Sequence, residues 1–342
     1  MVKVLAIYDG NGPTYHRLYI PLSAMPEIEV TFTNYIGEGG KVTESDLKDY
    51  QVVYFNRIFP GNKLSQVIQW RAKYGFKLIC DLDDHWDLDP NHILYGYYKE
   101  KNLSTYILHA AMVSDAVTVT HERLADAVLP YNRNVWVLPN AIDSQHPQFK
   151  INHQPSARTR LFWAGGITHE PDISILRNPI KKINSDWYLT GALMMVMGGY
   201  MEGHSAWDRM ATMYTNGLRM PGVVLKGRPV HEYYSLYEYC DIAMVPLQDN
   251  KFNGHKSNLK ILEAANIGKP VIVSKVNPYL DFPEHLVNYV TKQTDWYRHV
   301  RHLVRDNKFA EQQGAALKDF CNVHYNFDKI NQIRCELITT IL

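Results

Sequence analysis

Two lysines and a glutamate lie close together in residues 253–274, which read NGHKSNLKILEAANIGKPVIVS. In a helix turning about 100° per residue, Lys256, Lys260 and Glu263 fall on one narrow stripe. Cations beside a helix N-terminus suit a phosphate, because the free N–H groups and the positive end of the dipole attract anions. The carboxylate can accept hydrogen bonds from sugar hydroxyls. These residue types therefore suit a ligand with both phosphate and hydroxyl groups, and a solvated helix face is the alternative.

A second polar cluster, residues 81–89, contains five aspartates and His85. It follows a predicted strand at 76–80, and open α/β sheets bind ligands beyond the carboxyl ends of their strands. The cluster could ligate a divalent metal, bind an acceptor, or supply a base or polarising group. The structural alternative is an Asp-rich turn that caps a helix. Because clustered like charges are costly unless a cation or hydrogen-bond donor meets them, we favour a functional role.

Alternating strands and helices must position both clusters. The first half shows predicted strands at 2–8, 28–32, 52–55, 76–80, 116–120 and 135–138, with helices at 63–74, 103–113 and 121–128. The pattern restarts after a polar segment at 145–158, with strands at 161–164, 193–197, 223–225, 241–246 and 271–274. Helices are predicted from 171 onward, at 230–239, 257–268 and 296–304, and from 308 to 342. Two such sets, each with a glycine turn after its first strand, predict two doubly wound, Rossmann-like α/β domains facing across a cleft.

Bulk properties narrow the class of protein. The chain has 342 residues, 46% of them hydrophobic, and a net charge of +1, which argues against a general nucleic-acid coat. Four widely spaced cysteines predict reduced thiols, not a zinc site or a disulfide frame. No apolar run reaches the length of a signal peptide or membrane span, so we expect a cytoplasmic protein, in host cytoplasm if viral.

One local charge bias remains. Residues 63–77 carry Lys63, Arg71, Lys73 and Lys77 and no acid. This run could meet an acidic acceptor, a phosphate backbone or the inner membrane face, and a solvated helix face is the alternative.

Several short motifs, in this order and spacing, resemble the retaining family-4 type of GT-B glycosyltransferase across nearly the whole chain. The landmarks are VLPNAID at 137–143, WAGG at 163–166 with His169 and Asp172, YCDIAMVPL at 239–247, and LEAA at 262–265 followed by GKPVI at 268–272.

The resemblance implies a donor site in the second domain. It implies that Glu263 binds the nucleotide ribose and that Lys256, Ser257 and Asn258 hold the diphosphate, beside Lys260. It places Arg228 near the nucleotide base, and Gly10, Gly12 and Gly166 at the turns nearest the pyrophosphate and sugar.

One position departs from the family pattern. The family often carries two glutamates separated by seven residues, and Glu263 fits the second, whereas His255 occupies the first. His255, or the backbone of residues 254–258, would then contact the transferred sugar. The resemblance also places the reaction centre after the strand at 76–80, where Asp83, Asp84 and His85 are further catalytic candidates. Because the family usually needs no metal, the aspartates are expected on the acceptor side and no metal or other cofactor is expected.

The predicted function is transfer of a sugar from a nucleotide-diphosphate sugar, a UDP-hexose, with retention of anomeric configuration. The acceptor would be a carbohydrate, a lipid-linked sugar or a modified base in viral DNA. The predicted units are an acceptor-side domain at 1–148, a donor domain at 149–320 and a helix at 321–342 that crosses back. A sugar epimerase or phosphorylase and a non-catalytic sugar-nucleotide-binding protein are the alternatives.

Overall fold

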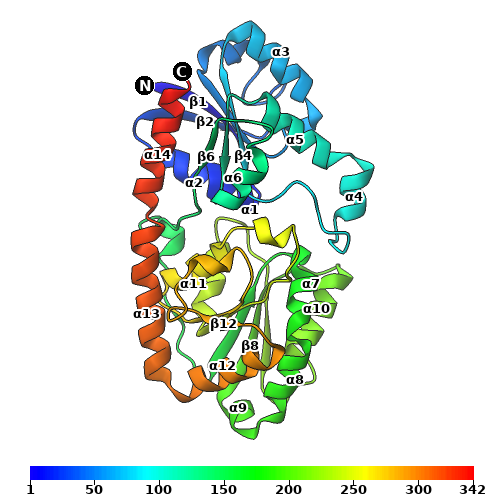
Figure 1. Ribbon diagram of the computed structural model, residues 1–342, viewed down its shortest axis with the longest axis vertical. Helices are drawn as coiled ribbons and strands as arrows, with labels where there is room; N and C mark the ends of the chain where they lie inside the picture. Colours follow the sequence, from blue (N-terminus) through cyan, green and yellow to red (C-terminus); the bar gives the residue numbers. More distant parts are fainter.

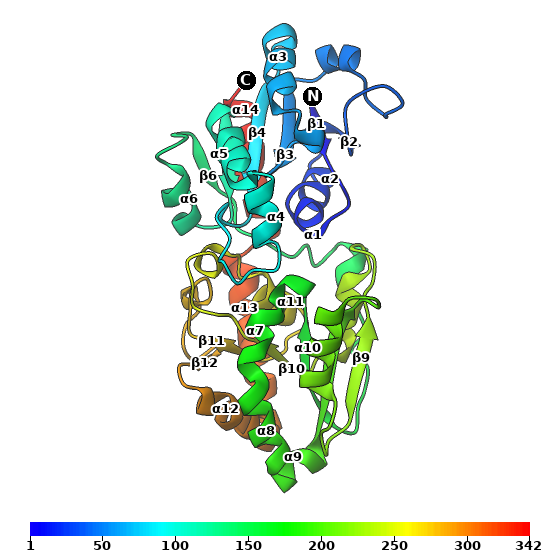
Figure 2. The ribbon, with the colours of Figure 1, turned by 90° about the vertical axis from the view of Figure 1, so that its right-hand side faces the viewer.

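Two parallel six-stranded sheets form the frame of the protein. The computed structural model describes residues 1–342, except for the side chain of Asn62. Figures 1 and 2 show two α/β units, one above the other. The first sheet has the order β2-β1-β3-β4-β5-β6 and the second β12-β11-β10-β7-β8-β9. The two doubly wound domains expected from the sequence are therefore present.

The strands of the first sheet are β1 Val2–Ile7, β2 Ile28–Thr33, β3 Val52–Asn56, β4 Lys77–Leu82, β5 Ala116–Val119 and β6 Val135–Val137. Those of the second are β7 Thr159–Ala164, β8 Leu193–Tyr200, β9 Gly222–Lys226, β10 Ile242–Val245, β11 Val271–Ser274 and β12 Asn288–Val290. The central strands β3, β4, β10 and β11 are buried along nearly their whole length because helices cover both faces of each sheet.

The helices of the first unit are α1 Gly12–Thr14, α2 Ile20–Ser23, α3 Leu64–Tyr74, α4 Tyr95–Glu100, α5 Leu103–Val113 and α6 Glu122–Val128. Those that follow are α7 Glu170–Ile173, α8 Arg177–Ser185, α9 Trp187–Ala192, α10 Ser205–Thr215, α11 Leu259–Asn266, α12 Gln293–Arg305, α13 Asn307–His324 and α14 Phe327–Thr340. None of the described helices is long and apolar enough to cross a bilayer.

The last two helices run along both units (Figure 1). α13 packs against α11 of the second unit, with Leu317 in that core. α14 begins after Asn326, whose side chain accepts a hydrogen bond from the Lys329 N–H (3.0 Å). Its residues Leu337 and Ile338 are buried in the core beneath the first sheet, so the chain end ties the two units together.

Two predicted elements are corrected by the structure. The predicted helix 230–239 is only a 3₁₀ helix, Tyr233–Tyr239. Its three-residue repeat brings the rings of Tyr234 and Tyr237 onto one side, where they stack with centroids 5.2 Å apart. The predicted strand end at Gly198-Gly199 is also wrong, because β8 continues to Tyr200. Gly199 has φ +94°, and a Cβ there would lie 2.7 Å from the Gly165 carbonyl oxygen, so close approach of backbones requires this glycine.

We predict that Leu337→Ala destabilises the protein by about 2–5 kcal/mol, because it opens a cavity in the core that α14 shares with the first sheet. The urea-unfolding midpoint measures this loss. Gln332→Ala, on the exposed side of the same helix, is the matched control and should shift the midpoint little. Equal shifts for the two variants would show that α14 does not stabilise the first unit.

Candidate active site

The carboxyl ends of both sheets face a shared cavity of about 640 Å³. The first unit contributes residues from the loops after β1, β4 and β6, among them Gly12, Arg17, Asp83, Asp84 and Asn140. The second contributes Gly166, His169, Arg228, Lys256, Ser257, Lys260 and Glu263. Residues separated by more than 150 positions in the sequence therefore line one space.

Lys260 and Glu263 line the part of the cavity that the second unit forms. Glu263 is 2% exposed, and its Oε2 accepts a hydrogen bond from the Tyr237 hydroxyl (2.6 Å). Burial raises the pKa of Glu263, although Lys260 and Tyr237 oppose the rise. Lys260 Nζ donates to the Ala164 carbonyl (2.7 Å), and burial lowers the pKa of this lysine. The glutamate is thus held against the cavity by a fixed partner, which orients it for hydroxyl groups.

Lys256 crosses the cleft to meet the aspartate loop. Its Nζ lies 3.5 Å from Asp84 Oδ2, and the Arg57 guanidinium lies 3.6 Å from the same oxygen. Burial would raise the pKa of Asp84, but Lys256 and Arg57 outweigh it and lower the pKa. The pKa of the neighbouring Asp83 shifts in the opposite direction, because burial and the charge of Asp84 raise it. The two adjacent carboxylates are therefore electrostatically different.

Arg57 is a residue for which the sequence offered no signal. It has φ +54°, a left-handed conformation that is costly for a residue with a Cβ. This turn directly after β3 places the guanidinium against both aspartates and against the Tyr98 hydroxyl (3.0 Å). We infer that the strain is retained because it brings a cation to the carboxylates.

Asp81, the first member of the aspartate cluster, is wholly buried and has a structural role. Arg17 binds it through Nη2 (2.7 Å), and Thr118 and Asn56 donate to it at 2.6 and 2.9 Å. Arg17 also donates to the Leu138 carbonyl (2.5 Å), which joins the loops after β1, β4 and β6. The aspartates are thus matched by cations and amide donors. Among the described residues, no group of three or more His, Cys, Asp or Glu side chains is arranged to hold a metal ion.

The two histidine candidates, His85 and His255, meet each other at the unit interface, with ring centroids 4.7 Å apart. His85 is 1% exposed, stacks on Trp86 and accepts a hydrogen bond from the Asp87 N–H (2.9 Å). Burial and the charges of His255 and Lys251 lower the pKa of His85 to about 4. Neither histidine is among the described residues that line the cavity.

Three further contacts join the loop before α11 to the first unit. Arg123 donates to the Gly254 carbonyl (2.8 Å), and Lys251 pairs with Asp87 (3.7 Å). The ring of Phe252 meets that of His92 edge to face. This loop is therefore held by the first unit as well as by its own sheet.

The other residues predicted to bind the sugar donor differ in their position relative to the cavity. Ser257 and Gly166 line the cavity, and Arg228 lies on its rim with half of its side chain exposed. Asn258 is the N-cap residue of α11 and is buried, and it is not among the described lining residues. The helix begins two residues later than the predicted start, at Leu259.

The basic run at 63–77 is partly neutralised, because two carboxylates pair with three of its four cations. Lys73 donates to Glu44 (2.9 Å), and Arg71 and Lys77 both pair with Asp115. Both views place α3 at the end of the first unit that faces away from the second (Figures 1 and 2). The partners come from other elements, so the tertiary structure reduces an excess of positive charge that the linear sequence shows in full.

Several solved structures resemble this one over most of its length. HepE of Anabaena in complex with UDP-glucose matches with a TM-score of 0.66 over 99% of this chain and 100% of that one, at 13% identity. An alpha-glucosyltransferase in complex with UDP and a 13-mer DNA containing an HMU base matches with a TM-score of 0.63 over 99% of both chains, at 12% identity. TarM of S. aureus matches at 0.63 and 13% identity, and this chain spans 55% of its length. The chain has the GT-B fold. No family model and no curated protein sequence matches it.

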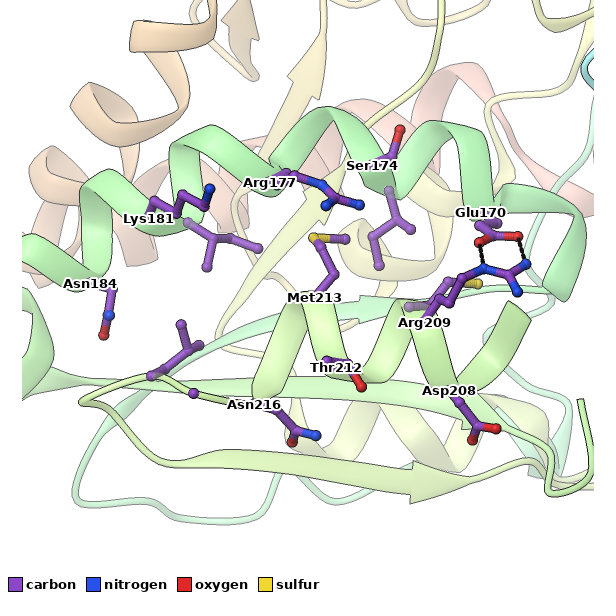
Figure 3. Close-up of a pocket in the computed structure, with 15 residues that line it drawn as sticks. Glu170, Ser174, Arg177, Lys181, Asn184, Asp208, Arg209, Thr212, Met213 and Asn216 are labelled. Carbon is purple, nitrogen blue, oxygen red and sulfur yellow. Dashed lines mark hydrogen bonds and ion pairs between the residues drawn. The ribbon is translucent and has the colours of Figure 1, made fainter. Parts of the chain in front are cut away.

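A second cavity in this GT-B protein, also about 640 Å³, lies on the outside of the second unit. Figure 3 shows it between the α7–α8 segment and α10, with the Glu170–Arg209 ion pair at one end. Met213 and Ile180 form part of its apolar floor. It contains none of the predicted site residues and receives nothing from the first unit. The interdomain cavity is therefore the candidate active site of the GT-B fold.

We predict that Lys256→Met weakens UDP binding by roughly 10- to 100-fold, because the variant removes a cation that lines the cavity and that would attract the phosphates of such a ligand. Isothermal titration calorimetry measures the dissociation constant. Lys251→Met is the matched control, since this lysine also pairs with an aspartate of the same loop but lies outside the cavity. A similar loss in both variants would show that domain contact, not phosphate contact, explains the effect.

Proposed function

We propose that the protein transfers a sugar from a nucleoside-diphosphate sugar, a UDP-hexose, to an acceptor hydroxyl with retention of anomeric configuration. One observation carries this proposal. A single cavity combines two lysines, a helix N-terminus and a buried carboxylate on one wall with two aspartates on the other. The likeness to structures that hold UDP or UDP-glucose supports it.

The second unit, residues 149–320, is the donor domain in this proposal. Lys256, Ser257 and the N-terminus of α11 hold the diphosphate, with Lys260 beneath them. Glu263 accepts hydrogen bonds from the ribose hydroxyls through the oxygen that Tyr237 leaves unoccupied. Arg228 on the rim meets the base. Because these donors are fixed before the reaction, they stabilise the charge that develops on the departing diphosphate.

The first unit, residues 1–148, supplies the acceptor wall, and the segment 321–342, which contains α14, crosses back to it. Asp83 and Asp84 accept the hydrogen bond of the attacking hydroxyl and orient it. The bond between the anomeric carbon and the β-phosphate oxygen breaks, with its electron pair passing to that oxygen. The acceptor oxygen bonds to the carbon on the same face, and its proton passes to the departing diphosphate. His85 and His255 support the loops on either side of the cavity.

The donor assignment is tested by a thermal-shift panel of nucleotide sugars. A ligand at 100 times its dissociation constant stabilises the native state by about 2.7 kcal/mol, so UDP and UDP-hexoses are expected to raise the melting temperature. We predict that Glu263→Gln raises the dissociation constant of UDP-glucose at least about tenfold, because an amide replaces one acceptor oxygen. Glu284→Gln, at an exposed ion pair with Lys275, is the control. Unchanged binding by Glu263→Gln would remove Glu263 from the ribose site.

Turnover separates the enzyme from the alternatives. An enzyme of this class releases UDP slowly from UDP-glucose without acceptor and faster with one. An epimerase isomerises or hydrolyses the donor at a rate that does not depend on an acceptor, and a non-catalytic binding protein releases no nucleotide with any donor. Analysis of the product anomer by NMR then shows whether configuration is retained.

A modified base in DNA is the second acceptor candidate, favoured by the full-length likeness to the alpha-glucosyltransferase that holds DNA with an HMU base. For this acceptor we predict that duplexes with hydroxymethylpyrimidines gain the mass of one hexose, whereas matched unmodified duplexes do not. Binding of duplex DNA should weaken with rising salt, because phosphate contacts release counterions. A flat salt dependence, or glucosylation of simple sugars alone, points to a carbohydrate acceptor.

A further inference from the structure

We propose that His169 and Asp172 form a proton-gated clamp for the donor diphosphate. The imidazole takes up a proton from solvent as the anionic ligand enters, and its Nε2–H then donates a hydrogen bond to a phosphate oxygen. This assignment rests on the proposed nucleotide-sugar function and deepens it. The WAGG motif pointed to this turn, but neither composition nor spacing assigned the histidine a role.

The geometry fixes the imidazole in one orientation. His169 Nδ1 lies 2.7 Å from Asp172 Oδ2, and Asp172 is 3% exposed. The other carboxylate oxygen accepts from the Gln248 N–H (2.9 Å) and from Asn253 Nδ2 (3.0 Å). A carboxylate held by three donors stays ionised, so Nδ1 carries the hydrogen that binds it. Nε2 is then the ring atom left for a ligand, and His169 lines the cavity.

Charged groups around the ring set its protonation in the empty cavity. Lys256 and Lys260 from the second unit act on His169, and Asp172 opposes them. From the first unit Asp84 also faces it. Burial lowers the pKa of His169 to about 4, and the two lysines add to this against Asp172. The imidazole is therefore neutral near neutral pH, and its Nε2 lone pair would repel a phosphate oxygen.

A diphosphate reverses this balance. Its negative charge offsets the two lysines, so the pKa of His169 rises in the complex and the imidazolium becomes favourable beside Asp172. A group whose pKa is raised by a ligand takes up protons on binding, and the ligand then binds more tightly as pH falls. A purely structural His169–Asp172 pair would show neither effect.

The test is calorimetric titration of UDP-glucose, without acceptor, in buffers of different ionisation enthalpy between about pH 5.5 and 8. The diphosphate diester of UDP-glucose does not titrate in this range, so the exchanged protons come from the protein. Wild type is expected to take up protons, increasingly as pH falls, with affinity falling as pH rises. His169→Gln is expected to lose this uptake and to bind roughly 10- to 100-fold more weakly.

His92→Gln is the matched control. Burial also lowers the pKa of His92, the ring lies near Asp172, and yet it is outside the described lining of the cleft. This variant should keep the uptake of wild type. In addition, NMR of ¹⁵N-labelled histidine in wild type should show that the His169 Nε2 signal moves to the imidazolium position when UDP-glucose binds.

Three outcomes separate the two proposals. Tight binding without proton uptake overturns the clamp and leaves the proposed function standing. Uptake that persists in His169→Gln also overturns it, because another group, such as Asp84, then takes the proton. Failure of wild type to bind any nucleotide sugar overturns the proposed function and the clamp with it.

Discussion

The ion pair between Lys256 and Asp84 joins the two halves of the site. Each charge comes from a different α/β unit, and each lies where the carboxyl ends of a parallel sheet open into the cleft. Arg57 also pairs with the Asp84 carboxylate, and its own backbone adopts the unfavourable left-handed conformation. The loop before α11 is then held to the first unit by Arg123 and Lys251. Because these contacts bridge the units, a change in cleft opening must break or remake charge pairs inside the cavity.

Two other buried carboxylates, those of Asp81 and Glu263, are also paired with hydrogen-bond donors or cations. Asp81 is satisfied by Arg17 and two neutral donors, and Glu263 by a tyrosine hydroxyl with Lys260 nearby. Such groups are costly to bury alone, and their hydrogen-bond donors come from other strands and helices, whereas Lys260 shares α11 with Glu263. The same network that lowers this cost aligns the loops after β1, β4 and β6. The same hydrogen bonds therefore stabilise the fold and position the loops of the site.

The walls of the cavity carry titratable groups whose pKa values are shifted in opposite directions. Lys256 and Arg57 lower the pKa of Asp84, burial raises the pKa of Asp83 and Glu263, and burial lowers the pKa of His169. A diphosphate would change the balance of all of these at once. The cavity is thus suited to an anionic ligand whose arrival alters the protonation of its walls.

Local pattern in the sequence determined the two-domain α/β class, the positions of most strands along the chain, and the helix that carries both Lys260 and Glu263, whereas Lys256 lies before that helix on extended backbone. These features depend on periods of 2 and 3.6 residues and on glycine and proline positions, which act over short distances along the chain. The same pattern misjudged β8, because Gly199 is required by the carbonyl of Gly165 on a neighbouring loop. It also showed residues 63–77 with an excess of positive charge that Glu44 and Asp115 reduce by pairing with three of the four cations.

Only the tertiary structure decided which polar residues share the cavity. His85 and His255 have suitable chemistry, but they pack against each other at the interface. His169, Arg57 and Asn140 reach the cavity or its aspartates from loops distant in sequence. Such contacts depend on how two sheets are oriented and on which loop ends meet, and no local period encodes that. The sequence determined which chemistry the chain could carry, and the packing of two domains decided which side chains carry it.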